Sequence, residues 1–214
     1  MNRADRFFTE EQMKQIVEAT RKAELHTTGE IVVLVADNSG RYYDIKVVSA
    51  LGLSAVISLL VSASVFHGSF WHWVALSAAL FPFSFLFFAR VQTVTIGLVP
   101  HRRIEAAVRD NAMREFYEHG LHKTKGQTGV LFYISLIERR TFMYADRGIY
   151  EKITQSVLNQ YAREMAAGIK AGSACEALVQ AITEIGAVLA AHFPGSSDNV
   201  NELPDSVLSD SDQE

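Results

Sequence analysis

The hydrophobic positions along this chain follow two different periods, and together they predict an α/β fold. Four segments carry apolar residues at helical spacing: residues 9–24, 101–120, 150–171 and 173–193. Three shorter segments are runs of β-branched and aromatic residues, as in buried strands: residues 29–37, 129–135 and 140–146. Only the polar link LIERR joins the last two runs, which predicts a β-hairpin with a charged, solvated tip.

The strongest feature of the pattern is a run of 43 residues, from 47 to 89, without a single Asp, Glu, Lys or Arg. A bilayer core takes about 20 apolar residues per helix, so this run is long enough for two spans. A glycine and two histidines interrupt it and divide it into predicted spans at residues 47–66 and 71–89. Both tryptophans, Trp71 and Trp73, lie at this break, as in an interfacial aromatic belt.

Small residues and flanking charges predict how the hairpin packs and how it is oriented. Ser54, Ser58 and Ser62 recur every four residues on the first span, so we expect the hairpin to pack closely on itself or on a partner. That partner is another membrane protein or a second copy of the chain. Basic residues flank both outer ends of the hairpin, and the connecting turn has none. The positive-inside rule then predicts a protein of the inner (cytoplasmic) membrane with two spans and both termini in the cytoplasm.

The soluble parts are predicted to form one domain that the hairpin interrupts. One helix and one strand precede the hairpin, and they cannot build a core alone. Residues 1–46 and 91–194 are therefore expected to form a small mixed sheet sandwiched by helices, with residues 47–90 inserted. Residues 195–214 hold six acids and no Lys or Arg, which predicts a disordered acidic tail. Without that tail the formal net charge changes from −4 to +2, too little basic excess for a nucleic-acid binder.

Three stretches resemble a known family: TGEIVVLVAD, GLHKT, and TGVLFYISLIERRTFMYADRGIYEKI. They are similar to the TPM-domain family, which includes thylakoid acid-phosphatase-like proteins and a photosystem-repair factor. The likeness is greater to its bacterial integral-membrane branch, in which a transmembrane hairpin follows the first strand, and it covers residues 25–46 and 100–193. It implies a compact α/β domain. Phosphatase activity and divalent-metal binding through acidic residues near strand ends are ascribed to some members, and accessory roles in membrane complexes to others.

The corner YADRGIYEKI, residues 144–153, carries the main candidate site. Asp146 ends a strand, where its carboxylate could bind Ca²⁺ or Mg²⁺, and Arg147 with the following helix amides would face a phosphate. Gly148 is expected to turn the chain with a positive φ. If the strands ending at Asp37 and Asp146 are parallel neighbours, the two carboxylates share one sheet edge and form a metal site. The alternative is that Asp146 caps the turn and Arg147 points to solvent.

Two functions follow from these features. The first is a membrane-anchored accessory or interaction protein of a membrane complex. The second is a divalent-metal-dependent phosphatase with Asp37, Asp146 and Arg147 as catalytic residues. The sequence lacks a GxxxxGK[ST] loop, a GxGxxG after the first strand, HExxH and GxSxG, which argues against ATPases, dehydrogenases, zincins and α/β-hydrolases. The chain's one cysteine, Cys175, has no histidine near it in sequence and is not expected to be a nucleophile.

Overall fold

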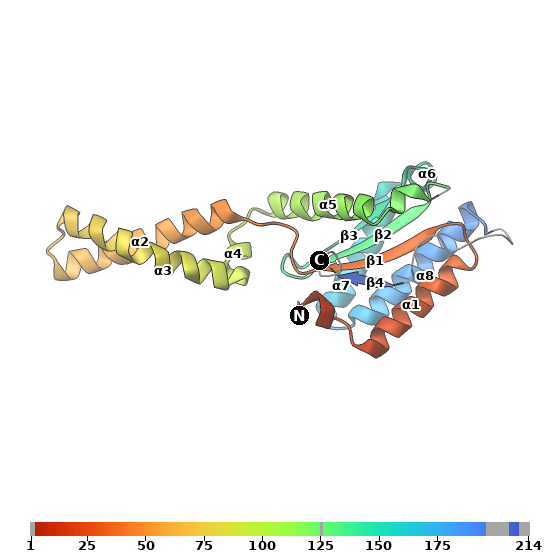
Figure 1. The fold of residues 1–214 in the computed structure, drawn as a ribbon, viewed down its shortest axis with the longest axis horizontal. Coiled ribbons are helices and arrows are strands. Elements are labelled where there is room, and N and C mark those ends of the chain that lie inside the picture. Colours follow the sequence, from red (N-terminus) through yellow and green to blue (C-terminus); the bar gives the residue numbers. More distant parts are fainter. Residues whose placement is uncertain (1–2, 125, 196–205, 210–214) are drawn as a thin grey trace. The chain divides into compact units, whose positions relative to one another are not determined.

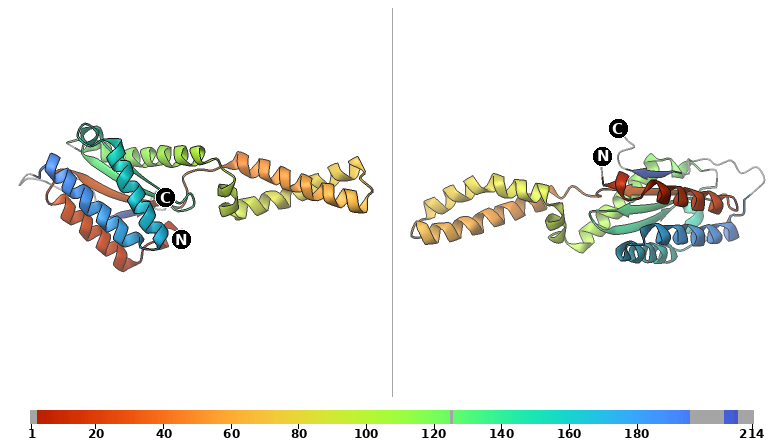
Figure 2. Two further views of the ribbon diagram at one scale, coloured as in Figure 1. Left: turned by 180° about the vertical axis from the view of Figure 1, so that it is seen from behind. Right: turned by 90° about the horizontal axis from the view of Figure 1, so that it is seen from below.

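The computed structural model describes residues 3–124, 126–195 and 206–209. The chain divides into two units. The hairpin unit is Gly40–Ile104, and the rest of the chain, Met1–Ser39 with Glu105–Glu214, is the α/β unit. Figures 1 and 2 show a four-stranded sheet with helices on both faces in the α/β unit, and two long helices in the hairpin unit.

The sheet is mixed, as predicted, with the strand order β3-β2-β1-β4. Its strands are β1 (Glu30–Ala36), β2 (Gly129–Ser135), β3 (Arg140–Ala145) and β4 (Val207–Ser209). β1 is parallel to both β2 and β4, whereas β3 runs antiparallel to β2. The unbroken apolar run of β1 is explained by this central place, because all seven of its residues are buried.

The two faces of the sheet are covered by different helices (Figure 1). Ile31, Val33 and Val35 point into a core shared with α1 (Glu10–Glu24), α7 (Gln155–Ala171) and α8 (Ala174–His192). The opposite face carries Tyr133 and Tyr144, which contact α5 (His101–Glu118). Helix α1 begins with the expected capping box, in which the side chains of Thr9 and Gln12 each accept the other's backbone N–H.

The predicted disordered tail, residues 195–214, lies outside the described residues except at residue 195 and residues 206–209. There the expectation does not hold, because Val207–Ser209 form β4 along the outer side of β1. Val207, Leu208 and Ser209 are paired in register with Val33, Leu34 and Val35. These few residues supply the hydrogen bonds that the open edge of a hydrophobic parallel strand requires, which composition alone does not reveal.

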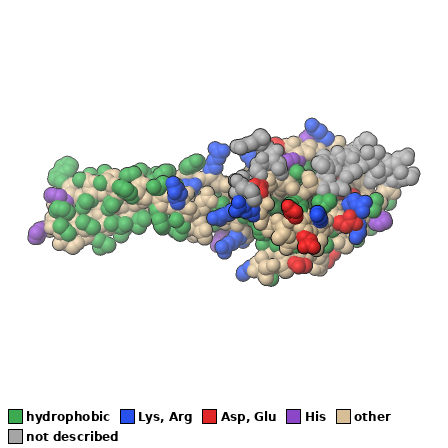
Figure 3. All heavy atoms as spheres, turned by 60° about the horizontal axis from the view of Figure 1, so that its bottom comes forward, with side chains coloured by type: hydrophobic (Ala, Val, Ile, Leu, Met, Phe, Trp, Pro, Cys, Tyr) green, Lys and Arg blue, Asp and Glu red, His purple; other side chains and the backbone are tan. Residues whose placement is uncertain are grey.

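The hairpin unit contains two long helices close to the predicted spans, α2 (Tyr43–Val65) and α3 (Phe70–Arg90), and a short α4 (Gln92–Gly97). Ser54, Ser58 and Ser62 are all buried in the unit, so the small-residue stripe forms the seam between α2 and α3. Across this seam the indole Nε1 of Trp73 donates to the carbonyl of Ala55 at 3.1 Å. Hydrophobic side chains cover the outside of the hairpin in Figure 3, with histidines at its turn.

Candidate functional site

The structure places Asp37 and Asp146 at opposite ends of the sheet, so the predicted shared metal site is wrong. Asp37 follows the last residue of β1. The backbone N–H of Asp146 donates to the carbonyl of Gly129 at 2.9 Å, and Gly129 is paired with Glu30, the first residue of β1. A seven-residue strand is about 23 Å long, far beyond the reach of two ligands of one cation. The prediction failed because β3 is not a parallel neighbour of β1: β2 lies between them, parallel to β1 and antiparallel to β3.

Asp37 anchors the N-terminal segment of the chain. Its Oδ1 accepts the backbone N–H of Ala4 at 2.6 Å, and its Oδ2 accepts that of Arg3 at 3.2 Å. These donors belong to the first turn of the short 3₁₀ helix η1 (Ala4–Arg6). Because both oxygens of the carboxylate are engaged by backbone amides, the geometry gives Asp37 a positional role.

Asp146 and Arg147 follow the capping alternative. Asp146 is the N-cap of α6 (Arg147–Tyr150), and its Oδ1 accepts the N–H of Arg147 at 2.7 Å. The Arg147 side chain is 81% exposed and pairs with Glu151 at 3.3 Å. The φ angle of Gly148 is not positive, contrary to expectation. It is required for close approach, since a Cβ there would lie 2.7 Å from the carbonyl oxygen of Gln127.

The other oxygen of Asp146 is an unusual group at this corner. Oδ2 is buried and has no hydrogen-bond partner among the described residues. The charge of Asp146 acts on Tyr144: burial, together with Tyr117, Tyr150 and this charge, raises the pKa of Tyr144 to about 12. Within the described part of the chain no three His, Cys, Asp or Glu side chains converge on a point that would hold a metal ion.

The two histidines near this corner, His119 and His122, each have a buried ring nitrogen, Nε2 and Nδ1 respectively, without a hydrogen-bond partner among the described residues. Gly120, at φ 73°, lies between the two histidines just after the end of α5. The Nε2 of His119 lies 3.5 Å from Oε2 of Glu115, and the ring of His122 lies 5.1 Å from the ring of Tyr117. Burial alone would raise the pKa of Glu115, but His119 and Arg114 hold that pKa below its usual value.

At the opposite end of the sheet, a buried carboxylate was missed by sequence reasoning. Glu138 belongs to the supposedly solvated link between β2 and β3, yet it is only 4% exposed. Its Oε1 accepts the N–H of Ser39 at 3.0 Å, and its Oε2 accepts the hydroxyl of Ser135 at 2.6 Å. The hydroxyl of Ser39 also lies 2.9 Å from that of Tyr133. This network fixes the chain where it leaves β1, which is a structural role.

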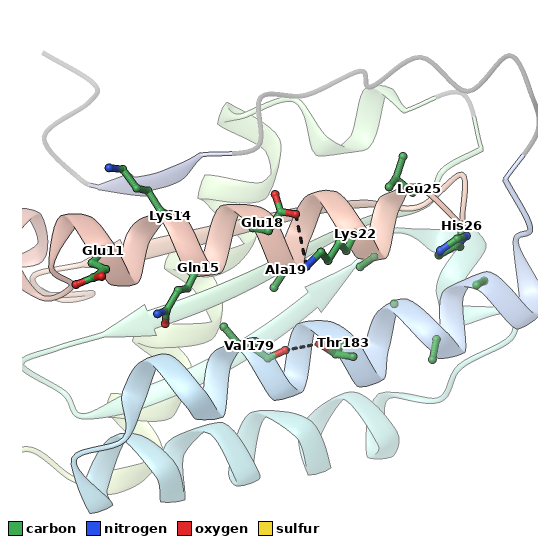
Figure 4. Close-up of a pocket in the computed structure, with 14 residues that line it drawn as sticks. Glu11, Lys14, Gln15, Glu18, Ala19, Lys22, Leu25, His26, Val179 and Thr183 are labelled. Carbon is green, nitrogen blue, oxygen red and sulfur yellow. Dashed lines mark hydrogen bonds and ion pairs between the residues drawn. The ribbon is translucent and has the colours of Figure 1, made fainter.

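A groove of about 1120 Å³ runs along the outer surface between α1 and α8 (Figure 4). Small residues of both helices line it, including Ala19, Ala23, Gly186, Ala187 and Ala190. Lys14, Glu18 and Lys22 of α1 are also among its lining residues. Glu18 is already paired with Lys22 at 3.5 Å, so the groove offers apolar contact area and no concentrated charge.

Comparison with known proteins agrees with this geometry. The family model described as TPM domain matches residues 90–188. Among solved structures, the fold is similar to the NMR structure of the BA42 protein from the psychrophilic bacterium Bizionia argentinensis. The TM-score is 0.60 at 23% sequence identity, and the match covers 95% of each chain. No curated protein matches this chain.

Proposed function

Because the chain belongs to the TPM-domain family, we propose that it is a two-span membrane protein whose TPM domain serves as an interaction module at the cytoplasmic face. In this proposal the hairpin unit is the anchor and the α/β unit is the part that meets other components of a membrane complex. The function is binding, and the corner at Asp146 acts as a turn of the fold.

The observation that carries the proposal is the surface of the hairpin. Its two helices are long and apolar enough to cross a bilayer. Their buried positions include the serines of the seam, whereas large apolar side chains face outward, among them Leu51, Leu59, Leu60, Phe83 and Leu86. Water would penalise this arrangement heavily, since each such side chain gains roughly 1.5–3 kcal/mol on burial in an apolar medium. A lipid environment removes the penalty.

A third helix, α8, is also long and apolar enough to span a membrane, but its surroundings argue for a different role. Leu178, Ile182, Ile185 and Leu189 of α8 are fully buried in the core of the α/β unit. If α8 crossed the membrane, the sheet would lose these core side chains. We therefore assign two spans to the protein.

The choice of binding over catalysis rests on how the acidic residues are used. The phosphatase alternative needs a divalent cation, and Asp37 and Asp146 stand at opposite strand ends with backbone amides as their partners. The groove between α1 and α8 supports an interaction role, and Leu25 beside it is 66% exposed.

Three measurements on the full-length protein test the proposal. Carbonate extraction should leave it in the membrane pellet. Reporter fusions at Gly68 and after Pro194 should then report opposite sides, with the latter in the cytoplasm. Hydrolysis of p-nitrophenyl phosphate with Ca²⁺ or Mg²⁺ should stay at the level of the Asp146→Asn variant. Release by carbonate would overturn the anchoring, and metal-dependent hydrolysis lost in Asp146→Asn would establish the phosphatase instead.

A further inference from the structure

A second pocket of the α/β unit, of about 850 Å³, is lined by five cationic side chains. They come from three separate parts of the chain: Arg3 and Arg6 from the N-terminal segment, Arg139 and Arg140 from the turn into β3, and Lys170 from the last turn of α7. No Asp or Glu is among the described residues that line the pocket. We propose that this cationic pocket binds a phosphate-bearing anion, which in the membrane-anchored protein is the headgroup of an anionic phospholipid.

Three of the five cations are available to a ligand. Arg139, Arg140 and Lys170 form no ion pair with any other described residue, and the buried Nε of Arg140 has no hydrogen-bond partner among them. A buried guanidinium nitrogen without an acceptor is costly, and a phosphate oxygen is the acceptor that a guanidinium fork fits well.

The backbone at Arg139 gives an independent indication. Arg139 has φ 52°, in the left-handed region that glycine or asparagine would occupy at lower cost. The side chain of Arg139 lines the pocket. A need for its positive charge there would explain why arginine occupies this position despite the backbone cost. The C-terminal end of α7 contributes about half a negative charge to the pocket, which five cations outweigh.

The apolar part of the pocket lining and its short distance along the chain from α2 favour a lipid over a soluble phosphate. Phe7, Ile134, Leu136 and Ile169 line it beside the cations, so it offers apolar contacts as well as charge. Ser135 of the lining is paired with Ala36, the last residue of β1. Only six residues separate Ala36 from Tyr43, where α2 begins, and seven extended steps span at most about 25 Å. This part of the inference rests on the proposed membrane anchoring.

The test uses the full-length protein purified in an uncharged detergent. Native mass spectrometry would measure the binding of dihexanoyl phosphatidylglycerol, with dihexanoyl phosphatidylcholine for comparison, and calorimetry would measure the binding of inorganic phosphate. The test variant combines Arg139→Gly with Arg140→Gln. Glycine suits the left-handed backbone, so the first substitution removes a cation without straining the fold. The matched control is Arg163→Gln, which removes an exposed cation of α7 that does not line the pocket.

We expect the double variant to bind phosphatidylglycerol about 25-fold more weakly, at roughly fivefold for each cation, while the control stays at the wild-type level. Weak binding of inorganic phosphate would identify the lipid as the source of the anion. Tight phosphate binding that the double variant loses would support the same pocket with a soluble ligand. Equal binding by wild type, double variant and control in both assays would overturn the proposal. Because detergent replaces the bilayer, this result does not depend on the outcome of the topology experiment.

Discussion

The contact between α1 and α8 at Gly186 allows a quantitative test of the fold. A Cβ built on Gly186 would lie 2.5 Å from the Cβ of Ala23, whereas non-bonded carbons prefer about 3.5–4.0 Å. Gly186→Ala therefore pushes the helices apart by about 1 Å, and overpacking of this kind costs roughly 1–3 kcal/mol. The better helix propensity of alanine returns about 1 kcal/mol. The net loss of stability is about 0–2 kcal/mol. A loss of about 1 kcal/mol, the middle of this range, lowers the melting temperature by roughly 2–4 °C in a chain of this size.

The natural cysteine provides the assay. Cys175 is the one cysteine of the chain, it is 2% exposed, and its Sγ lies 3.5 Å from Oε1 of Gln15 on α1. Burial also raises the pKa of this thiol, so little reactive thiolate forms in the folded protein. A fluorogenic maleimide added during a thermal ramp should label Cys175 only when α1 and α8 separate. The labelling midpoint thus reports unfolding of the α/β unit in the intact, detergent-purified protein.

Two further variants decide whether the steric reasoning is correct. Combining Ala23→Gly with Gly186→Ala restores the space between the helices. The double variant should therefore regain most of the decrease in the labelling midpoint temperature. Gly52→Ala introduces the same methyl group into α2, where a Cβ meets nothing within 4 Å, and should leave the midpoint unchanged. The reasoning is refuted if Gly186→Ala melts above the wild-type temperature, or if Gly186→Ala melts below the wild type and the double variant melts no higher than Gly186→Ala.

The remaining predictions concern three carboxylates that accept hydrogen bonds or pair with cations in the fold. Asp37→Ala frees the amides of Arg3 and Ala4 and should cost about 0.5–2 kcal/mol, seen as faster trypsin cleavage near the N-terminus; unchanged cleavage would contradict the anchoring role. Glu138→Ala leaves buried donors unsatisfied and should cost about 1–3 kcal/mol in the labelling midpoint, with the exposed Glu164→Ala as a neutral control. The lowered pKa of Glu115 contributes stability above pH 4.5 that is lost as pH falls through the folded-state value, so Glu115→Gln should melt lower than wild type at pH 7 and converge with it below pH 4.5 by circular dichroism. A constant difference between the two across that range would contradict this assignment.

Local sequence determined the elements of this protein and their kinds. The uncharged run of residues 47–89 predicted α2 and α3, since crossing a bilayer depends on the length and composition of one segment. The buried position of β1 followed from its run of β-branched residues. Each of these inferences uses residues within a few positions of one another, where backbone preference and side-chain periodicity act directly.

Tertiary structure alone decided what these elements bring together. The predicted hairpin already made β3 antiparallel to β2, but only the parallel pairing of β1 with β2 puts the end of β3 beside the start of β1 and so separates Asp146 from Asp37. The same holds for Glu138, which looks like a solvated turn residue until Ser39 is placed 3.0 Å away. The five cations of the second pocket are up to 167 positions apart in the chain, between Arg3 and Lys170. Long-range packing sets such proximities, and a local pattern carries no information about it.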